Sequence, residues 1–442
     1  MASGRATELL ADVWALLGGD PAELARLELS GPADTLPSTL HVTATASAAV
    51  AASLLAASET SGADVALDTR QVAVAIRSEH HLLRDGASMG DPLDPLSAFY
   101  PTADGWLRLH GNYPWHRDAA LRVLGCGPAH AEVAAAVLRW PDRELEDALH
   151  AAGGVASAVR SEPQWRESEQ AQAAAELPLL EVRQIGDAAP RAPRRPRVLD
   201  LTRVIAGPVA TRTLAVHGAD VLRIDAPDRP ESPLLFADTA PGKRSATLDL
   251  ETTTGRQALD ELLAGADAVA LGHRPGALDR FGLSAPELAR RHPGVVVLVL
   301  SAWGHTGPWA GRRGFDSLVQ AATGISMAES VDGRTPGVLP AQLLDHASGC
   351  LAAAGVLRAV TEQRRIGGSW LVRLSLAQTA HWLVGLGRRP APDVDALDPA
   401  PYVEQLGRLS IASPPGRLGG RPLHWPAPPP GFGADSAAWT RP

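Results

Sequence analysis

Asp345 is the residue whose type and position could do chemistry most directly. It ends the phrase PAQLLD and comes just before an alanine-rich stretch that is typical of a helix. Near the N-terminus of a helix, the backbone dipole and the free N–H groups favour an ionised carboxylate. An ionised carboxylate can attack a thioester carbonyl and form a covalent intermediate. The alternative is that Asp345 only caps the helix, as aspartate commonly does in that position.

Four basic residues on loops after predicted strands could hold phosphate groups. Arginine binds phosphate through its forked donors, whereas lysine acts as a mobile point charge. Each of them could be a solvated surface residue, but parallel sheets bind ligands at such loops, so their joint occurrence indicates a site. They are Lys243 and Arg244 in PGKRSATLDL, Arg274 in GHRPG, and Arg280 in LDRFGL. For His346, which follows Asp345, we expect a solvated or capping side chain, because neighbouring residues at a helix start point in different directions.

Strand and helix patterns alternate through the part of the chain that carries these residues. Short apolar runs predict strands at residues 198–201, 221–224, 268–271 and 295–300. Helices are predicted at 208–217 and 254–264, and Ser284 with Glu287 has the spacing of a capping box at the start of a third. Such alternation requires right-handed crossovers and predicts a doubly wound parallel α/β sheet.

The composition of the chain predicts a boundary near its middle. In residues 187–197, DAAPRAPRRPR, proline, alanine and arginine replace the apolar periodicity found on either side, which is typical of a linker. We therefore expect an N-terminal region at 1–186, a large domain at 198–387 and a Pro/Gly-rich extension at 388–442 that wraps over a surface in extended form.

A faint internal repeat links the two halves. Residues 46–58 followed by 62–73 parallel residues 347–359 followed by 368–380. Where the second copy has Asp345 and His346, the first has Ala44 and Thr45, so the first copy could not perform the same chemistry. Alanine-rich helices also resemble each other by chance, and the degenerate copy at about 40–80 is one of two open interpretations.

Composition and charge exclude several function classes. The chain has 442 residues, enough for at least two domains, and a net charge of −8, which disfavours nucleic acid as a partner. Cys126 and Cys350 lack the spacing of a metal site or a disulfide, which fits a reducing cytoplasm, and no metal is expected. The first residues lack the apolar core of a signal peptide, and residues 41–58 are too short to span a bilayer. These features predict a soluble cytoplasmic protein with no membrane partner.

The C-terminal half resembles the class III CoA-transferases, the family of formyl-CoA and carnitine CoA-transferases and the related acyl-CoA racemases. The resemblance is carried by RVLDLTRVIAGPVATRTLAVHGADVLRID, PGKRSATLDL, GHRPGALDRFGL and LLDHASG. It implies a Rossmann-like large domain and a smaller α+β domain, for which residues 96–186 are the candidate. It also implies an interlocked homodimer, although the fused N-terminal half could supply in one chain what a partner usually provides.

The resemblance implies a covalent reaction at Asp345. The carboxylate would attack the thioester carbonyl of an acyl-CoA, giving an acyl-aspartyl anhydride and CoA thiolate. CoA would return to form an aspartyl-CoA thioester, from which an incoming carboxylic acid collects it. Backbone N–H groups of the glycine-rich phrases are candidates for stabilising the oxyanions. The basic positions above match those that bind CoA in the family.

The chain departs from the family pattern at several positions. In GRRGFDSLVQAATG, Phe315 precedes Asp316 where racemases have histidine and aspartate, and phenylalanine cannot shuttle a proton. Asp316 could then be a structural acid. Ile205, after Val204, replaces a polar glutamine, and Gly272 with His273 replaces an asparagine and phenylalanine. The smaller domain precedes the large one, which reverses the usual order.

Three other functions remain open from the sequence. Strand, helix, strand and Asp225 have the spacing of a dinucleotide fold, but the turn AGP holds one glycine where a diphosphate fingerprint needs three. The reversed order and the copy without the aspartate are compatible with a non-catalytic CoA-binding subunit. An acyl-CoA racemase or isomerase with a rearranged acid and base is the third alternative.

Overall fold

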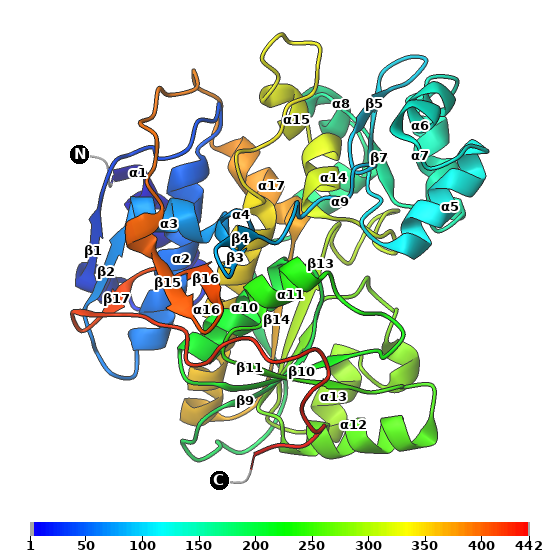
Figure 1. Cartoon of the computed structure of the whole chain (residues 1–442). Helices are drawn as coiled ribbons and strands as arrows, with labels where there is room; N and C mark the ends of the chain where they lie inside the picture. Colours follow the sequence, from blue (N-terminus) through cyan, green and yellow to red (C-terminus); the bar gives the residue numbers. More distant parts are fainter. Residues whose placement is uncertain (1–3, 441–442) are drawn as a thin grey trace.

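The computed structural model describes residues 4–440, and a seven-stranded sheet forms its centre (Figure 1). The strand order is β11-β10-β9-β12-β13-β14-β8, with six parallel strands and antiparallel β8 at one edge. Numbered along the chain, the parallel strands run 3-2-1-4-5-6, the order of dinucleotide-binding folds, which confirms the predicted doubly wound sheet. The strands are β8 (Glu181–Gly186), β9 (Arg197–Leu201), β10 (Asp220–Asp225), β11 (Lys243–Thr247), β12 (Ala268–Leu271), β13 (Val296–Ser301) and β14 (Ser369–Ser375).

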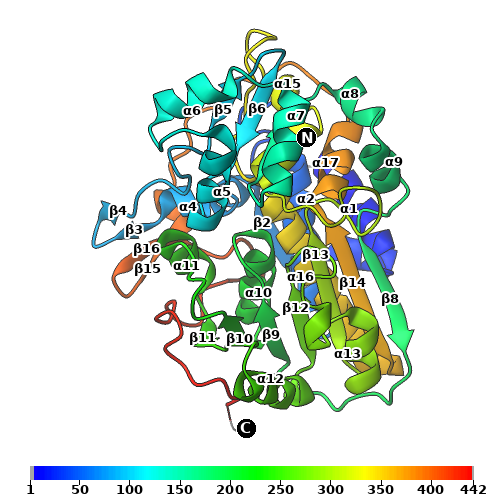
Figure 2. The same ribbon diagram turned by 90° about the vertical axis from the view of Figure 1, so that its right-hand side faces the viewer.

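Helices cover both faces of this sheet (Figure 2). On one face, α10 (Ala206–Val216) and α16 (Leu343–Ile366) share a core with alternate strand residues such as Val198 and Val296. On the other face, α12 (Thr253–Gly265) and α13 (Ala285–Arg291) pack against Leu199 and Val297. Helix α13 begins where the sequence predicted, but Ser284 makes no side-chain capping bond. The remaining helices of the C-terminal half are α11 (Pro233–Thr239), η2 (Asp279–Phe281), α14 (Asp316–Ala322), α15 (Ile325–Ala328) and α17 (Leu376–Gly385).

The first part of the chain packs alongside α16. Its elements are α1 (Gly4–Leu16), η1 (Pro21–Arg26), β1 (Leu27–Ser30), α2 (Val42–Ser58), β2 (Val65–Asp68), α3 (Thr69–Ala75) and α4 (Ser78–His81). Helix α2 is almost wholly buried, and its alanine and serine side chains let it lie close to α16. The succession α2, β2, α3 has the same order of element types as α16, β14, α17. The internal repeat itself stays a prediction.

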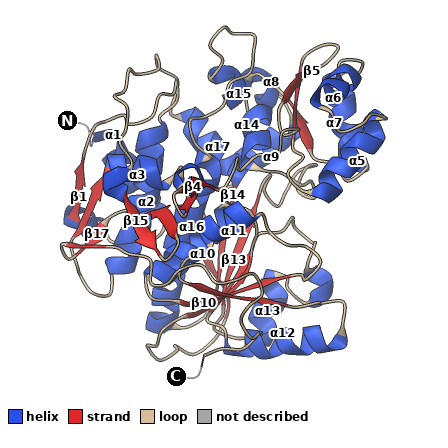
Figure 3. Ribbon diagram, in the orientation of Figure 1, coloured by secondary structure: helices blue, strands red, loops and turns tan. Residues whose placement is uncertain are grey.

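A smaller α+β layer follows and lies apart from the large sheet (Figures 1 and 3). Strands β5 (Phe99–Pro101), β6 (Trp106–Leu109) and β7 (Ala156–Ala158) form an antiparallel sheet. Helices α5 (Pro114–Leu124), α6 (His130–Val137) and α7 (Asp142–Ala151) share a separate core with it, and α8 (Glu162–Arg166) and α9 (Glu169–Ala175) lead back toward β8. The Arg160 N–H donates to Ala321 O of α14 and joins this layer to the C-terminal half.

The C-terminal extension differs from the extended wrap that the sequence predicted. It contains η3 (Ala400–Tyr402) and two hairpins, β15 (Val403–Leu406) with β16 (Leu409–Ala412), and β17 (Arg417–Leu418) with β18 (Arg421–Pro422). Strand β16 pairs with β3 (Leu83–Arg84), which pairs with β4 (Ala87–Ser88), and β17 pairs with β2. These strands form because edges of the N-terminal part offer unpaired backbone groups. The last residues run past β11, where Ser245 N donates to Asp435 Oδ2.

Two further segments differ from a simple sequence interpretation. Residues 187–196 have no regular structure, yet Arg191 and Arg194 both pair with Asp267 at 2.9 Å, so the predicted linker is fixed to the sheet. Helix α16 is long and apolar enough to cross a membrane, but 89% of its most apolar window is buried inside the protein. Its apolar composition is therefore that of a core helix.

Candidate active site

A cleft of about 400 Å³ opens at the carboxyl ends of the parallel strands. Arg203 and Val204 follow β9, and His273 and Arg274 follow β12, so the cleft lies where the strand order reverses. Doubly wound folds bind their ligands at this point, because the two neighbouring loops diverge to opposite faces of the sheet. Asp345 also lines the cleft from the first turn of α16.

Asp345 is buried, and its surroundings do not favour the ionised form that the sequence predicted. Burial, the charge of Asp316 and the charge of Glu79 together raise its pKa well above the ordinary value. Removal from water and two nearby acids therefore oppose the effect of the helix N-terminus, which favours the ionised form. Gln342 occupies the cap position of α16, and within residues 4–440 the Asp345 side chain makes no capping hydrogen bond.

Asp316, the first residue of α14, lies beside Asp345. Its Oδ2 accepts the backbone N–H of Asp345 at 3.0 Å, and its Oδ1 accepts a hydrogen bond from the Gln320 amide. Burial raises the pKa of Asp316 to about 6. Asp316 and Asp345 thus form a pair of buried carboxyl groups, which we call the acid pair.

His346 does not have the solvated or capping position expected from the sequence. It is buried, and its Nε2 lies 3.1 Å from Oε2 of Glu79, which comes from α4 in the N-terminal part. The expectation was wrong because α2 and α4 cover this side of α16. No local signal marks Glu79 as a partner, since the two residues are 267 positions apart in the chain.

Arginines dominate the charged lining of the cleft. Those that line it are Arg203, Arg229, Arg274, Arg312 and Arg313. Of these, the sequence prediction included only Arg274. Within residues 4–440, Arg274 and Arg313 form no salt bridge, and burial together with Arg274 and Arg229 lowers the pKa of Arg313. Positive charges that repel one another without a carboxylate partner are suited to bind an anion such as phosphate. The adjacent arginines in GRRGFD were the signal that could have indicated Arg312 and Arg313.

The structure corrects the expectation for Lys243. Its ammonium group is fully buried, 3.0 Å from Asp200 Oδ2, 2.9 Å from Pro208 O and 2.6 Å from Thr211 Oγ1. All three ammonium donors therefore have protein partners, and Lys243 cannot reach a ligand in the cleft. It ties β11 to β9 and α10.

Arg244 and Arg280 also lie away from the cleft lining. Arg244 pairs with Asp220 at 3.0 Å and donates to Ala438 O. Arg280 is exposed on η2 and pairs with Glu251. Among the four predicted cations, only Arg274 is placed with Asp345.

Val204 and Ile205 stand at the turn between β9 and α10. Val204 lines the cleft with φ of 71°, a left-handed conformation that is costly for a β-branched residue. Glu231 Oε2 accepts its N–H at 2.9 Å, which helps to hold this conformation. Ile205 is buried under the turn and does not line the cleft.

Aromatic side chains from the N-terminal half cover the cleft. Tyr113, Trp115 and His116 line it, and Arg229 lies 4.7 Å from the Trp115 ring centroid. Phe315 stacks on His110 with the ring centroids 3.8 Å apart. Burial lowers the pKa of His116 to about 4, so its imidazole is neutral near pH 7. Sequence reasoning missed this aromatic cover because it comes from a segment about 200 positions away from the rest of the site.

Comparisons with known proteins bear on the C-terminal half. The sequence model of the family described as CoA-transferase family III matches residues 196–387. A probable fatty acyl-CoA transferase of Mycobacterium tuberculosis is 32% identical over 240 residues, which cover 50% of this chain and 60% of the relative. An acyl-CoA transferase of Gibberella moniliformis is 31% identical, over 66% of this chain and 57% of the relative.

Two further matches cover similar shares. A formyl-CoA:oxalate CoA-transferase of Streptomyces avermitilis is 30% identical over 47% of this chain and 53% of the relative. A crystal structure of a hypothetical protein from Mycobacterium tuberculosis is 32% identical, with 45% of this chain and 58% of that chain covered and a TM-score of 0.42. The chain thus spans less than two thirds of the length of each of these proteins.

Proposed function

We propose that the chain, whose residues 196–387 match the sequence model of CoA-transferase family III, is a CoA-transferase that moves CoA between an acyl-CoA thioester and a free carboxylic acid. The observation that carries the proposal is the carboxyl group of Asp345 in the lining of a cleft whose other charged residues are five arginines and Asp225, which is paired with Arg223. A nucleophile for the thioester and cations for the CoA phosphates are thereby provided in one cavity.

The reaction follows from the chemistry of a carboxylate beside a thioester. Asp345, once deprotonated, adds to the thioester carbonyl, and the C–S bond breaks to release CoA thiolate and leave a mixed anhydride. The thiolate then attacks the aspartyl carbonyl, the acyl carboxylate departs, and Asp345 carries CoA as a thioester. The acceptor carboxylate attacks this thioester to give a second anhydride. CoA thiolate attacks the acyl carbonyl of that anhydride, which forms the new acyl-CoA and frees Asp345.

Arg274 and Arg313 are the proposed phosphate contacts. Both line the cleft without a carboxylate partner in the described residues, so a phosphate can bind them without first displacing an internal ion pair. Arg203 and Arg229 both lie against the Trp115 ring and already have acidic partners, Glu231 and Asp228 respectively, so we assign them to shaping the opening. Phe315, in place of a histidine, supports transfer over exchange of the α-proton.

The proposal is tested by following CoA from a series of acyl-CoA donors to labelled free acids. The Asp345→Asn variant should lose transfer by about three orders of magnitude or more, because an amide is a poor nucleophile. Asp118→Asn, an exposed change on α5, is the control that should keep wild-type turnover. With acyl-CoA and hydroxylamine, the wild type should be inactivated by modification at Asp345. A chain that binds CoA but shows neither transfer nor modification would be a non-catalytic subunit, and the proposal would be wrong.

A further inference from the structure

Glu79 brings a buried negative charge from the N-terminal half to the acid pair. It is 2% exposed and its Oε2 lies 3.1 Å from Nε2 of His346, the residue that follows Asp345. Although burial by itself opposes ionisation, the His346 imidazole lowers the pKa of Glu79 below its ordinary value. Glu79 therefore keeps its charge inside the protein and acts on Asp345 from a segment that the family match does not include.

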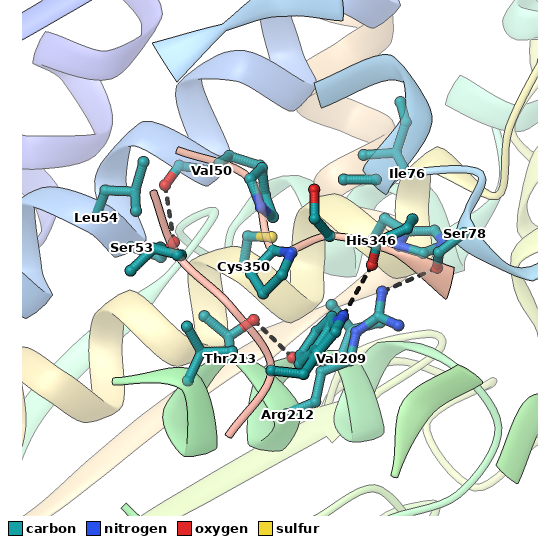
Figure 4. A pocket seen from close by; sticks show the side chains of 18 of the residues that line it. Val50, Ser53, Leu54, Ile76, Ser78, Val209, Arg212, Thr213, His346 and Cys350 are labelled. Atoms are coloured by element: carbon teal, nitrogen blue, oxygen red, sulfur yellow. Dashed lines mark hydrogen bonds between the residues drawn. The ribbon is translucent and has the colours of Figure 1, made fainter. Parts of the chain in front are cut away.

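The surroundings of His346 explain why the nearby charges fall into pairs. A small cavity of about 40 Å³ lies between α16, α10 and the C-terminal residues around Trp425. In Figure 4, Arg212 extends from α10 toward Ser78, and His346 lies close by. Arg212 lies 3.0 Å from Asp238 and so already has a carboxyl partner. His346 is thus left as the partner of Glu79.

The acid pair, Asp316 and Asp345, has no basic side chain as a partner within the described residues. Within residues 4–440, neither Asp316 nor Asp345 forms a salt bridge, so one of these two buried carboxyl groups must keep a proton near neutral pH. Nearby groups decide which one keeps it. Both carboxyl oxygens of Asp316 accept hydrogen bonds, from the Gln320 amide and from the Asp345 N–H, which favours the ionised form of Asp316. The charge of Glu79 disfavours the ionised form of Asp345.

We propose that Glu79 is a positioning residue for the nucleophile: together with His346, it keeps the proton of the acid pair on Asp345 in the free protein. The inference rests on the proposed function, in which Asp345 must later lose that proton to attack. A neutral Asp345 avoids a second buried charge beside Asp316 while the cleft is empty. The N-terminal half then contributes to the chemistry of the site as well as to its cover.

Other titratable groups also surround Glu79 and His346 and contribute to the pH dependence of the site. Glu79 Oε1 lies 3.8 Å from His80 Nε2 on α4, which is half exposed. The titratable and charged groups on the elements packed around Glu79 and His346 are Arg77, His80 and His81 beside α4, Arg212 and His217 from α10, Asp238 from α11, Asp316 from α14, and Asp345 and Cys350 from α16.

The Glu79→Gln variant tests the proposal through the pH dependence of kcat/KM. Its acid limb reports the free protein's essential base and belongs to the acid pair as a whole. Loss of the Glu79 charge favours ionised Asp345 directly. This change moves the acid limb to lower pH, by about one unit.

A second measurement does not depend on turnover. The carboxylic acid C=O stretch of Asp345, assigned in infrared spectra by its loss in Asp345→Asn, should disappear at lower pH in Glu79→Gln than in the wild type. If this band shifts but no variant transfers CoA, the proposed function is wrong and the role of Glu79 stands. If the wild type transfers CoA but neither the band nor the acid limb shifts, the role of Glu79 is wrong.

Two further variants separate charge from structure. Glu329 also joins the N-terminal part to the C-terminal half, through Ser38 at 2.9 Å and Thr39 at 2.8 Å, but it lies outside the acid pair. Glu329→Gln should therefore lower stability without moving the acid limb. Glu79→Asp keeps the charge and should keep a limb close to the wild type, and it replaces Glu79→Gln as the folded test if the latter fails to fold. The proposal is contradicted if Glu329→Gln moves the acid limb of kcat/KM as far as Glu79→Gln does. It is also contradicted if Glu79→Asp moves the acid limb to higher pH while the infrared band of Asp345 stays unchanged.

Discussion

The backbone N–H of Asp345 donates to Oδ2 of Asp316 across 3.0 Å, which holds two buried carboxyl groups side by side without a cation between them. Burial raises the pKa of Asp316 to about 6, and burial with the charge of Asp316 raises that of Asp345 well above its ordinary value. A site arranged in this way stabilises the protonated acids and destabilises the folded state when both ionise.

We therefore expect Asp345→Asn to raise stability at pH 8 and to have little effect at pH 4. At the lower pH, Asp345 is protonated in the folded state and only about half ionised in the unfolded chain, so its contribution is small. As the pH rises, the unfolded chain releases its proton first, so the folded state loses stability until its own raised pKa is passed. The gain of the variant at pH 8 should be about 1–3 kcal/mol, or a few degrees in Tm. A difference in Tm between the variant and the wild type that stays the same from pH 4 to pH 8 would contradict this origin of the raised pKa.

Arg274→Ala and Arg313→Ala should weaken binding of the CoA thioester with little change in folding. Each removes a cation without an internal carboxylate partner, so KM for acyl-CoA should rise about tenfold or more, and less at high salt. Arg280→Ala is the matched control, because its exposed pair with Glu251 lies outside the cleft. Steady-state kinetics at two ionic strengths measure both effects. Equal changes in all three variants would place the phosphate contacts elsewhere.

The large sheet could be predicted from the sequence because its signals are local. Buried parallel strands are continuous apolar runs bounded by turns, and the predicted strand at residues 268–271 coincides with β12. The position of Asp345 at the start of a helix was predictable for the same reason. Its protonation was not, because Asp316 and Glu79 reach it only through the tertiary fold.

The errors arose where a charged residue has a partner far away in the chain. Lys243 follows a strand pattern like a ligand-binding lysine, yet its partner Asp200 is 43 positions earlier and neutralises it in the core. His346 likewise has its partner Glu79 in another part of the fold. A pattern of residue types gives the sequence spacing but not the direction of a side chain, so it could not distinguish an internal ion pair from a phosphate site.

Lys243→Met should affect stability and leave acyl-CoA binding largely unchanged. Removal of the ammonium group leaves Asp200 buried with only hydroxyl and backbone partners, which costs about 3–5 kcal/mol of the free energy of unfolding. Adding Asp200→Asn should recover part of this loss, since the uncompensated charge is then gone. Urea denaturation of the single and double variants measures the coupling. A stable Lys243→Met protein with a greatly raised KM would return Lys243 to the binding site.

The last prediction concerns whether one chain makes a complete site. Tyr113, Trp115 and His116 of the N-terminal half lie over the same cleft that Asp345 and Arg274 line, so within one chain both halves contribute to it. We expect Trp115→Ala to lose at least about tenfold in kcat/KM, because the ring covers the cleft and contacts Arg229 at 4.7 Å. Mixing that variant with Asp345→Asn, after co-refolding, should restore no activity, since every site would keep one defect. If the two chains exchanged segments in a homodimer, a share of the mixed dimers would hold one intact site and turnover would return. Activity assays on the mixture, with the mass of the particle measured by light scattering, decide between these arrangements.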